Sequence, residues 1–127
     1  MMEDPKPKKI LIVDDDQKFV MALMTFLVGN GYQVLVAYDA TFAIQHAARE
    51  EVSLVILDLG LPSGGGLFVI ENLKRIPKTI CLPLIVSSAN IDPTMEEKVR
   101  ALGANDFFRK PYDLGKLLER IKALIPA

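Results

Sequence analysis

The sequence predicts an α/β fold, a doubly wound (βα)5 sandwich built around one five-stranded parallel sheet. Short apolar runs alternate with segments of helical periodicity along the chain, which is typical of strand–helix units around a parallel sheet. The connections are short, and polar residues follow directly after four of the five runs. We expect the strand order 2-1-3-4-5, with a ligand crevice at the carboxyl edge of the sheet.

Five apolar runs predict the strands. The first, third and fourth consist almost entirely of Val, Ile and Leu, as is typical of central strands that are buried on both faces. The second and fifth are shorter or more mixed, so we expect them at or near the sheet edges. The predicted strands are 10–13, 32–37, 52–57, 82–87 and 106–109.

Apolar residues at helical spacing predict the first, third and fifth helices. The segment 29–31, Gly-Asn-Gly, ends the first helix, and the third ends before Pro77. The fifth has a strongly amphipathic pattern. The stripes are Phe19, Leu23, Phe26 and Leu27; Leu67, Ile70, Leu73 and Ile76; and Leu114, Leu117, Leu118, Ile121, Leu124 and Ile125.

The second and fourth helices have weaker patterns. The second is alanine-rich and covers about 40–50. The fourth opens with Asp92 as N-cap and Pro93 at the first helical position, and Gly103 ends it. Because only three apolar residues anchor the fourth helix, we expect it to be the least firmly packed.

The composition narrows the class of protein. A chain of 127 residues, half of them hydrophobic, fits one domain with its own core and is not typical of disorder. The net charge of −1 predicts no direct nucleic acid binding. Residues 1–8 are interpreted as a flexible N-terminal tail rather than a signal peptide, and no apolar run approaches the ~20 residues that span a membrane. The single Cys81 fits a reducing compartment, so we expect a cytoplasmic protein.

Three consecutive acids follow the first predicted strand. Asp16 can serve as the N-cap of the next helix, but capping explains Asp14 and Asp15 poorly because they lie at the sheet edge. Neighbouring carboxylates repel each other unless a cation binds or a proton is taken up. A hard divalent ion with oxygen ligands relieves this repulsion, so we predict a Mg²⁺ site, for which Mn²⁺ is an alternative ion.

Asp58 ends the third predicted strand and precedes a glycine-rich loop. It is either a turn-forming residue or a nucleophile, and the cost of an unpaired buried carboxylate favours the nucleophile. A carboxylate can attack phosphorus to give an aspartyl phosphate, while a cation stabilises charge on the phosphoryl oxygens. No Gly-Lys-Ser/Thr follows the glycines, so the loop is not a Walker loop.

The fourth and fifth strands end in a hydroxyl and an ammonium. Ser88 either caps the turn or donates a hydrogen bond to a phosphoryl oxygen. Lys110 would lie beside the acids at the same sheet edge, and Pro111 can fix a cis peptide bond that aims the lysine side chain. The five side chains together fit a divalent metal and a phosphoryl group.

With these motifs in this order, the chain resembles the receiver domains of two-component response regulators, and in particular the chemotaxis-regulator-like ones. The resemblance covers KKILIVDDD, LVILDLGLPSGGG, PLIVSSAN and GANDFFRKPYD. It implies a flavodoxin-like receiver domain over 9–127, a signalling switch rather than an enzyme. The expected partners are a histidine kinase or phosphotransfer protein and a downstream protein or output domain.

The resemblance also assigns roles to individual residues. It makes Asp58 the phosphoacceptor and gives the metal direct ligands in Asp15, Asp58 and the Gly60 carbonyl, with Asp14 acting through water. The phosphate-binding and switch residues are Ser88, Ala89, Phe107 and Lys110, with the cis bond at Pro111. The surface of the fourth helix, fifth strand and fifth helix would change on phosphorylation, and a homodimer through the fourth and fifth helices is possible in this family.

Three positions depart from the commoner pattern of the family. Gly60 and Asn90 occupy positions thought to tune dephosphorylation, so the sequence does not predict the lifetime of the phosphorylated form. Phe107 lacks the hydroxyl of the commoner tyrosine, and we expect its ring to lean inward more readily.

Two alternative functions remain open at this stage. An aspartate-nucleophile phosphatase of the dehalogenase type needs a second acid two residues after the first, where this chain has Gly60. A receiver-like docking module that works without phosphorylation is disfavoured by the complete set Asp14, Asp15, Asp58, Ser88 and Lys110.

Overall fold

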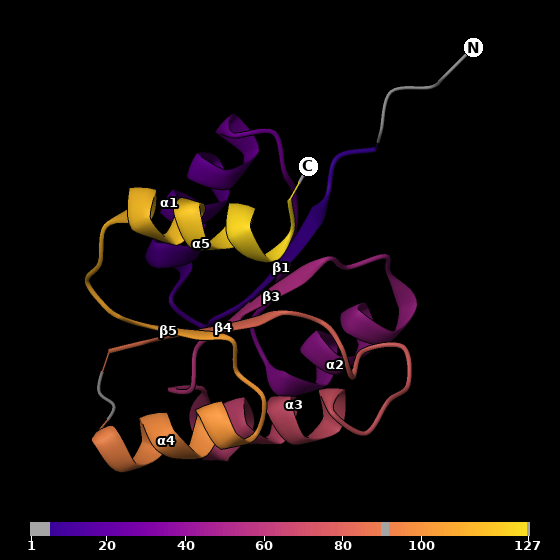
Figure 1. Cartoon of the computed structure of the whole chain (residues 1–127), viewed down its shortest axis with the longest axis vertical. Helices are drawn as coiled ribbons and strands as arrows, with labels where there is room; N and C mark the ends of the chain where they lie inside the picture. The colour runs from indigo at the N-terminus through magenta and orange to yellow at the C-terminus, as the bar shows by residue number, and fades with distance from the viewer. Residues whose placement is uncertain (1–5, 90–91, 127) are drawn as a thin grey trace.

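The computed structural model describes residues 6–89 and 92–126 (Figure 1). Its parallel strands lie in the order β2-β1-β3-β4-β5, which confirms the predicted fold class and places β2 and β5 at the edges. The strands are β1 (Lys9–Val13), β2 (Gln33–Ala37), β3 (Leu54–Leu57), β4 (Leu84–Ser88) and β5 (Asp106–Arg109). The helices are α1 (Gln17–Gly29), α2 (Ala40–Arg49), α3 (Gly65–Leu73), α4 (Pro93–Ala101) and α5 (Leu114–Leu124), with a short 3₁₀ turn η1 (Pro62–Gly64) before α3.

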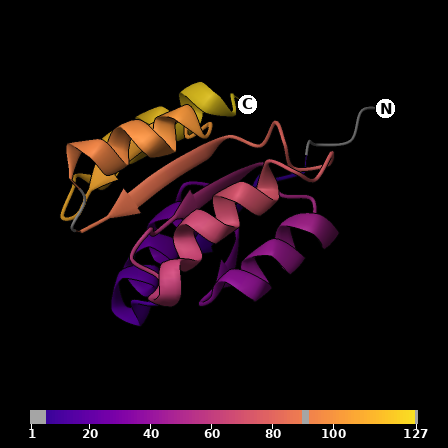
Figure 2. The same cartoon turned by 90° about the horizontal axis from the view of Figure 1, so that it is seen from below.

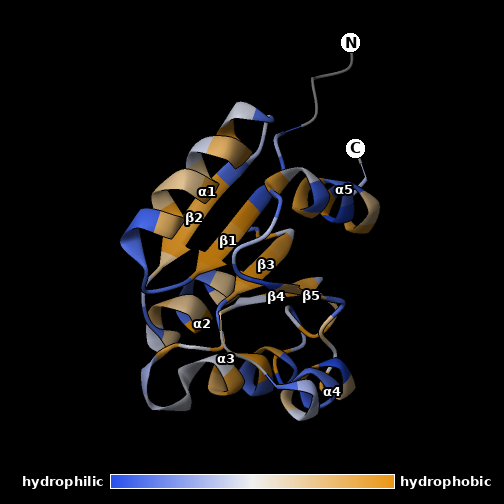
Figure 3. Ribbon diagram, turned by 90° about the vertical axis from the view of Figure 1, so that its left-hand side faces the viewer, coloured by the Kyte–Doolittle hydropathy of each residue, from blue (hydrophilic) through white to orange (hydrophobic). Residues whose placement is uncertain are grey.

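Two hydrophobic layers cover the sheet. Alternate residues of a strand point to opposite faces, so on β1 Leu11 and Val13 pack toward α2, α3 and α4, whereas Ile10 and Ile12 pack toward α1 and α5. Figure 1 shows the two groups of helices on opposite faces, and Figure 3 shows hydrophobic residues along the strands between them. This packing holds the carboxyl ends of the strands as one rigid edge.

Glycines bring α3 close to the end of β3. A Cβ on Gly66 would lie 2.5 Å from the Leu59 Cα, so only glycine fits there. A Cβ on Gly65 would lie 3.5 Å from the Ala40 Cβ, and α2 and α3 lie side by side (Figure 2). The glycine-rich segment therefore allows α3 to pack closely against the backbone of Asp58 and Leu59.

The ends of several elements differ from the predictions. β3 and β4 each begin two residues later than predicted, and Pro83, just before β4, has no N–H to donate to a neighbouring strand. α3 ends at Leu73 instead of continuing to Ile76. The buried Thr79 hydroxyl donates to the Leu73 carbonyl at 2.7 Å, and the Arg75 N–H turns back to the Asn72 carbonyl at 3.1 Å.

The predicted caps of α1 and α4 are confirmed. Asp16 accepts a hydrogen bond from the Phe19 N–H, and Asp92 accepts one from the Met95 N–H. Val99 is the only fully buried residue of α4, whereas α1 buries three; the expected shortage of anchors in α4 is therefore found.

Parts of two predictions lie outside the described residues. These are residues 1–5 of the predicted tail and Asn90. Among the described helices, none is long and apolar enough to span a membrane.

Candidate functional site

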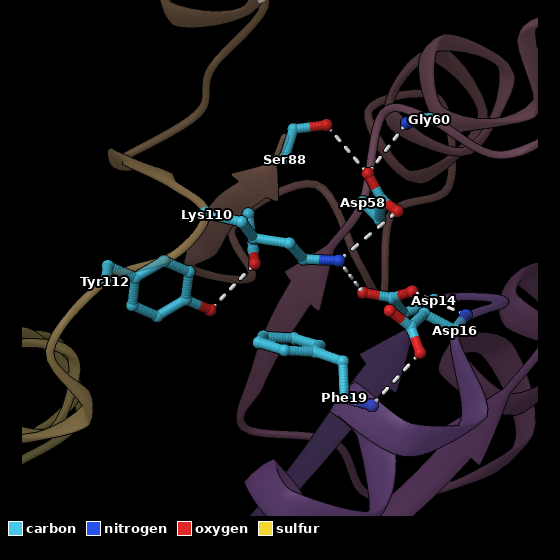
Figure 4. Close-up of polar contacts among 9 residues, drawn as sticks. Asp14, Asp16, Phe19, Asp58, Gly60, Ser88, Lys110 and Tyr112 are labelled. Carbon is cyan, nitrogen blue, oxygen red and sulfur yellow. Dashed lines mark hydrogen bonds and ion pairs between the residues drawn. The ribbon is translucent and has the colours of Figure 1, made fainter. Parts of the chain in front are cut away.

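Four strand ends meet at one edge of the sheet, as the sequence predicts. Asp14 follows β1, Asp58 follows β3, Ser88 ends β4 and Lys110 follows β5. Figure 4 shows these four side chains pointing toward one another. The strand order makes β1, β3, β4 and β5 consecutive neighbours, and this topology alone gathers residues from positions 14 to 110 into one site.

Three carboxylates can share one cation. Asp14, Asp15 and Asp58 each offer an oxygen, and these atoms lie within 4.8 Å of one another. Asp14 and Asp58 are buried, whereas Asp15 is exposed. An all-oxygen set that is open on one side fits a hard divalent ion that keeps some of its water.

Burial makes the acidic cluster electrostatically costly. It raises the pKa of Asp14, and hydrogen bonds from the Lys110 side chain and the Asp16 N–H offset this only in part. The charged form is therefore held at a cost in stability, and a bound cation would reduce that cost.

Lys110 lies between two of the acids. Its Nζ is 2.6 Å from Asp14 Oδ2 and 3.5 Å from Asp58 Oδ2. The Lys110–Pro111 peptide bond is cis, as predicted. The backbone N–H of Lys110 donates to the Ser88 carbonyl at 2.8 Å, which joins the loop after β5 to the end of β4.

The two oxygens of Asp58 have different surroundings. Oδ1 accepts hydrogen bonds from the Ser88 hydroxyl at 2.7 Å and from the Gly60 N–H at 2.8 Å, whereas Oδ2 faces Lys110. A Cβ on Gly60 would lie 3.2 Å from Oδ1, so glycine avoids a tight contact with that oxygen. The predicted metal contact of the Gly60 carbonyl stays a prediction.

The remaining predicted switch residues lie nearby. Ala89 is exposed directly after β4. Phe107 is partly buried and packs against the hydrophobic layer of α2, α3 and α4. Whether its ring moves between two states stays a prediction, as does the role of Asn90.

Two aromatic residues contact the site although the sequence pattern predicts no role for them there. The Lys110 Nζ lies 4.1 Å from the centre of the Phe19 ring, and the Tyr112 hydroxyl is hydrogen-bonded to Ser87 Oγ at 2.7 Å. Burial raises the pKa of Tyr112 to about 12. Phe19 fits the apolar stripe of α1, so its spacing gave no separate signal; Tyr112 follows the Lys-Pro pair and could have been considered.

A cavity of about 540 Å³ adjoins this cluster between α1 and the loop after β5. It is lined by Asp16, Phe19, Ala89, Lys110 and Tyr112, among others. Another cavity of about 550 Å³ lies at the opposite edge, around Lys8, Tyr32 and Lys122. Cavity size therefore does not identify the functional site. The charged and polar side chains beside the cavity between α1 and the loop after β5 do.

Comparisons with known proteins agree with this geometry. The chain is 36% identical over 118 residues to the transcriptional regulatory protein KdpE of Mycobacterium tuberculosis, covering 91% of this chain and 50% of the relative. It is 38% identical over 119 residues to GltR of Pseudomonas aeruginosa, covering 93% and 49%. The chain thus spans about half the length of the curated relatives that it matches.

Solved structures show the same fold. A CheY-like response regulator receiver domain protein from Methanospirillum hungatei has a TM-score of 0.86 at 26% identity, covering 92% of both chains. Vibrio cholerae CheY4 has a TM-score of 0.87 at 22% identity, covering 94% of this chain and 99% of its own. The family model of the response regulator receiver domain matches residues 10–122. The chain therefore belongs to the response regulator receiver domains, the phosphoryl-accepting signalling domains of two-component systems.

Proposed function

We propose that Asp58 is the residue that accepts the phosphoryl group, from a sensor histidine kinase or a phosphotransfer protein in the cytoplasm. The observation that carries this proposal is the arrangement around its carboxylate. One oxygen is held by two hydrogen-bond donors, the other faces an ammonium, and two more acids lie within reach of a shared cation. Such a carboxylate is fixed in place and faces a positive charge, and the exposed Asp15 beside it is where a ligand can approach.

The transfer balances without a further reactant. An oxygen of Asp58 forms a bond to phosphorus while the bond from phosphorus to the donor's imidazole nitrogen breaks. That nitrogen keeps the electron pair and takes up a proton from solvent water. Lys110 lies close enough to Asp58 to pair with a phosphoryl oxygen once the group is attached.

Mg²⁺, or Mn²⁺ in its place, fits the oxygen set of Asp14, Asp15 and Asp58, with the Gly60 carbonyl as a further ligand. When bound, the ion would neutralise charge on the phosphoryl oxygens. The raised pKa of Asp14 supports this, because burial disfavours its charged form, the Lys110 hydrogen bond offsets that only in part, and a bound cation would stabilise the charged form.

Switching would begin at Ser88. Its hydroxyl donates to Asp58 Oδ1 in the unphosphorylated protein and would donate to a phosphoryl oxygen afterwards. The extra contacts favour one of two conformations, which is a population shift. Phe107 is the adjacent aromatic of β5 whose ring would follow, so the surface of α4, β5 and α5 is the one that we expect a downstream protein, an output domain or a second copy to contact.

The alternatives receive no support of their own. Gly60 provides no second acid for a phosphatase of the dehalogenase type. A docking module that works without phosphorylation does not require the hydrogen bonds and the ion pairs that converge on Asp58.

Intact-mass measurement after incubation with acetyl phosphate and Mg²⁺ tests the proposal. We expect one added phosphoryl group, absent from Asp58→Asn and from a sample without divalent ions. An adduct of equal size on Asp58→Asn would place the acceptor elsewhere. No adduct on the wild type, with Mg²⁺ binding intact, would favour the docking module or a receiver that accepts phosphate only from its own kinase.

A further inference from the structure

The ammonium of Lys110 has a third neighbour besides its two acids. It lies 4.1 Å from the centre of the Phe19 ring, and only 14% of the lysine side chain is exposed. Figure 4 shows the ring beside the end of the lysine side chain, opposite Ser88. A cation this close to a ring face and this well shielded from water is attracted by the negative face of the aromatic ring.

The contact with the Phe19 ring can fix the position of the ammonium, which the two carboxylates cannot do alone. A lysine side chain is long and flexible, and its ammonium is a point charge with no fixed direction. The ion pairs are unequal, 2.6 Å to Asp14 and 3.5 Å to Asp58, and both acids would change partners when a metal and a phosphoryl group bind. The Phe19 ring takes no hydrogen bond and need not change partners, so it can hold the ammonium through the whole cycle.

The ring itself is held from two sides. Phe19 lies in the first turn of α1, where its N–H donates to Asp16 at 3.1 Å. Its ring meets Tyr112 edge-on, with centroids 6.0 Å apart and planes at 71°. Tyr112 is in turn fixed by its hydrogen bond to Ser87 and by the ring of Phe108 at 5.1 Å. The same loop therefore carries Lys110 and the residue that supports the Phe19 ring.

We propose that Phe19 is a positioning residue, whose ring face holds the Lys110 ammonium beside Asp58 for phosphoryl transfer. The proposal rests on the function proposed for Asp58 and Lys110. Phe19 also packs against the layer of α1 and α5, and a ring that served packing alone would act through its shape. A positioning ring acts through the electron density of its face, and the two roles can be separated by experiment.

The experiment replaces Phe19 with phenylalanines that carry one, two and three fluorine atoms. Fluorine weakens the negative face of the ring while changing its size little. We expect the phosphorylation rate with acetyl phosphate and Mg²⁺ to fall stepwise, by roughly threefold to tenfold in total. The phosphorylation rate of Phe19→Leu should equal or fall below that of the trifluorinated variant. The rate of Phe19→Trp, which keeps an electron-rich ring face, should stay near that of the wild type. The matched control is the same series at Phe26, which lies on the same helix and packs in the same layer.

A second readout needs no phosphodonor. In the unphosphorylated protein, the ¹⁵N–¹H signal of the Lys110 ammonium should shift and broaden stepwise across the Phe19 series and stay constant across the Phe26 series. A flat Lys110 signal overturns the proposal, and so does a graded signal with equal phosphorylation rates. If the wild type accepts no phosphate from acetyl phosphate, the chain is either a docking module or a receiver that needs its own kinase, and the Lys110 signal alone then decides whether Phe19 holds the ammonium.

Discussion

Two ionic clusters lie near the two ends of β5, and their surroundings differ. In the first, Lys110 faces Asp14 and Asp58 inside the carboxyl edge of the sheet, with Asp15 beside them. In the second, Asp106 of β5 pairs with Arg120 of α5 and lies 4.0 Å from Arg100 of α4. The first cluster is largely shielded from water, whereas both arginines of the second are nearly half exposed.

The balance of charge differs as well. The first cluster sets one ammonium against two buried carboxylates and the exposed Asp15, so it is short of positive charge until a cation binds. The surface cluster sets two guanidinium groups against Asp106 and Glu96, which balances without a ligand. We infer that the first cluster binds a cation and a phosphoryl group, whereas the surface cluster links α4, β5 and α5. Variants in the two clusters should therefore respond differently to pH, salt and Mg²⁺.

The largest effect on stability is expected from Lys110→Met. Removing one partner of a buried ion pair leaves the other charge uncompensated, which costs about 3 kcal/mol. We expect a loss of this order in the free energy of unfolding, measured by urea denaturation without divalent ions. Added Mg²⁺ should restore part of the loss, because the ion binds only the folded site. A loss below about 1 kcal/mol would show that solvent screens this cluster as it screens a surface pair.

The buried region should also determine the alkaline limit of stability. Burial raises the pKa of Tyr112 from 10.0 to about 12, so its neutral form is favoured by folding. This stabilisation is fully present below pH 10 and is lost as the pH rises toward 12, by about 2 to 3 kcal/mol. Tyr112→Phe should flatten the fall in unfolding free energy between these pH values. Tyr38→Phe, at an exposed tyrosine, is the control, and an equal effect of both variants would contradict the prediction.

Asp14→Asn should stabilise the protein near neutral pH. Burial raises the pKa of Asp14, so its contribution is favourable below the unfolded value of 3.8 and is lost as the pH rises through the folded value. Above that range the ionised group opposes folding. We therefore expect a gain in unfolding free energy at pH 7, measured by urea denaturation, together with weaker stabilisation by Mg²⁺. A destabilised variant would mean that the Lys110 pair outweighs the cost of burial.

The sequence predicted the charged and polar residues of the first cluster, but it did not indicate the two aromatic residues that contact them. Asp14, Asp58, Ser88 and Lys110 each follow an apolar run, and sheet topology brings strand ends together whatever the side chains are. Phe19 and Tyr112 were not assigned a role because their contacts depend on how α1 packs against the loop after β5. The apolar spacing extends α3 three residues too far, to Ile76. The Leu73 carbonyl has no helical donor because Pro77 lacks an N–H, and the buried Thr79 hydroxyl, which lies beyond the helical pattern, donates to it instead.

The smallest effect is expected from Arg120→Ala in the surface cluster. An exposed ion pair gains little in water and is screened by salt, so we expect a loss of about 0.5 kcal/mol in unfolding free energy that shrinks further at 1 M salt. The loss from Lys110→Met should persist at the same salt concentration, because its partners are buried. The pair of variants, measured by urea denaturation at low and high salt, therefore separates the two clusters. Equal salt dependence would place both in the same electrostatic environment and remove the distinction between a cluster that binds and a cluster that connects.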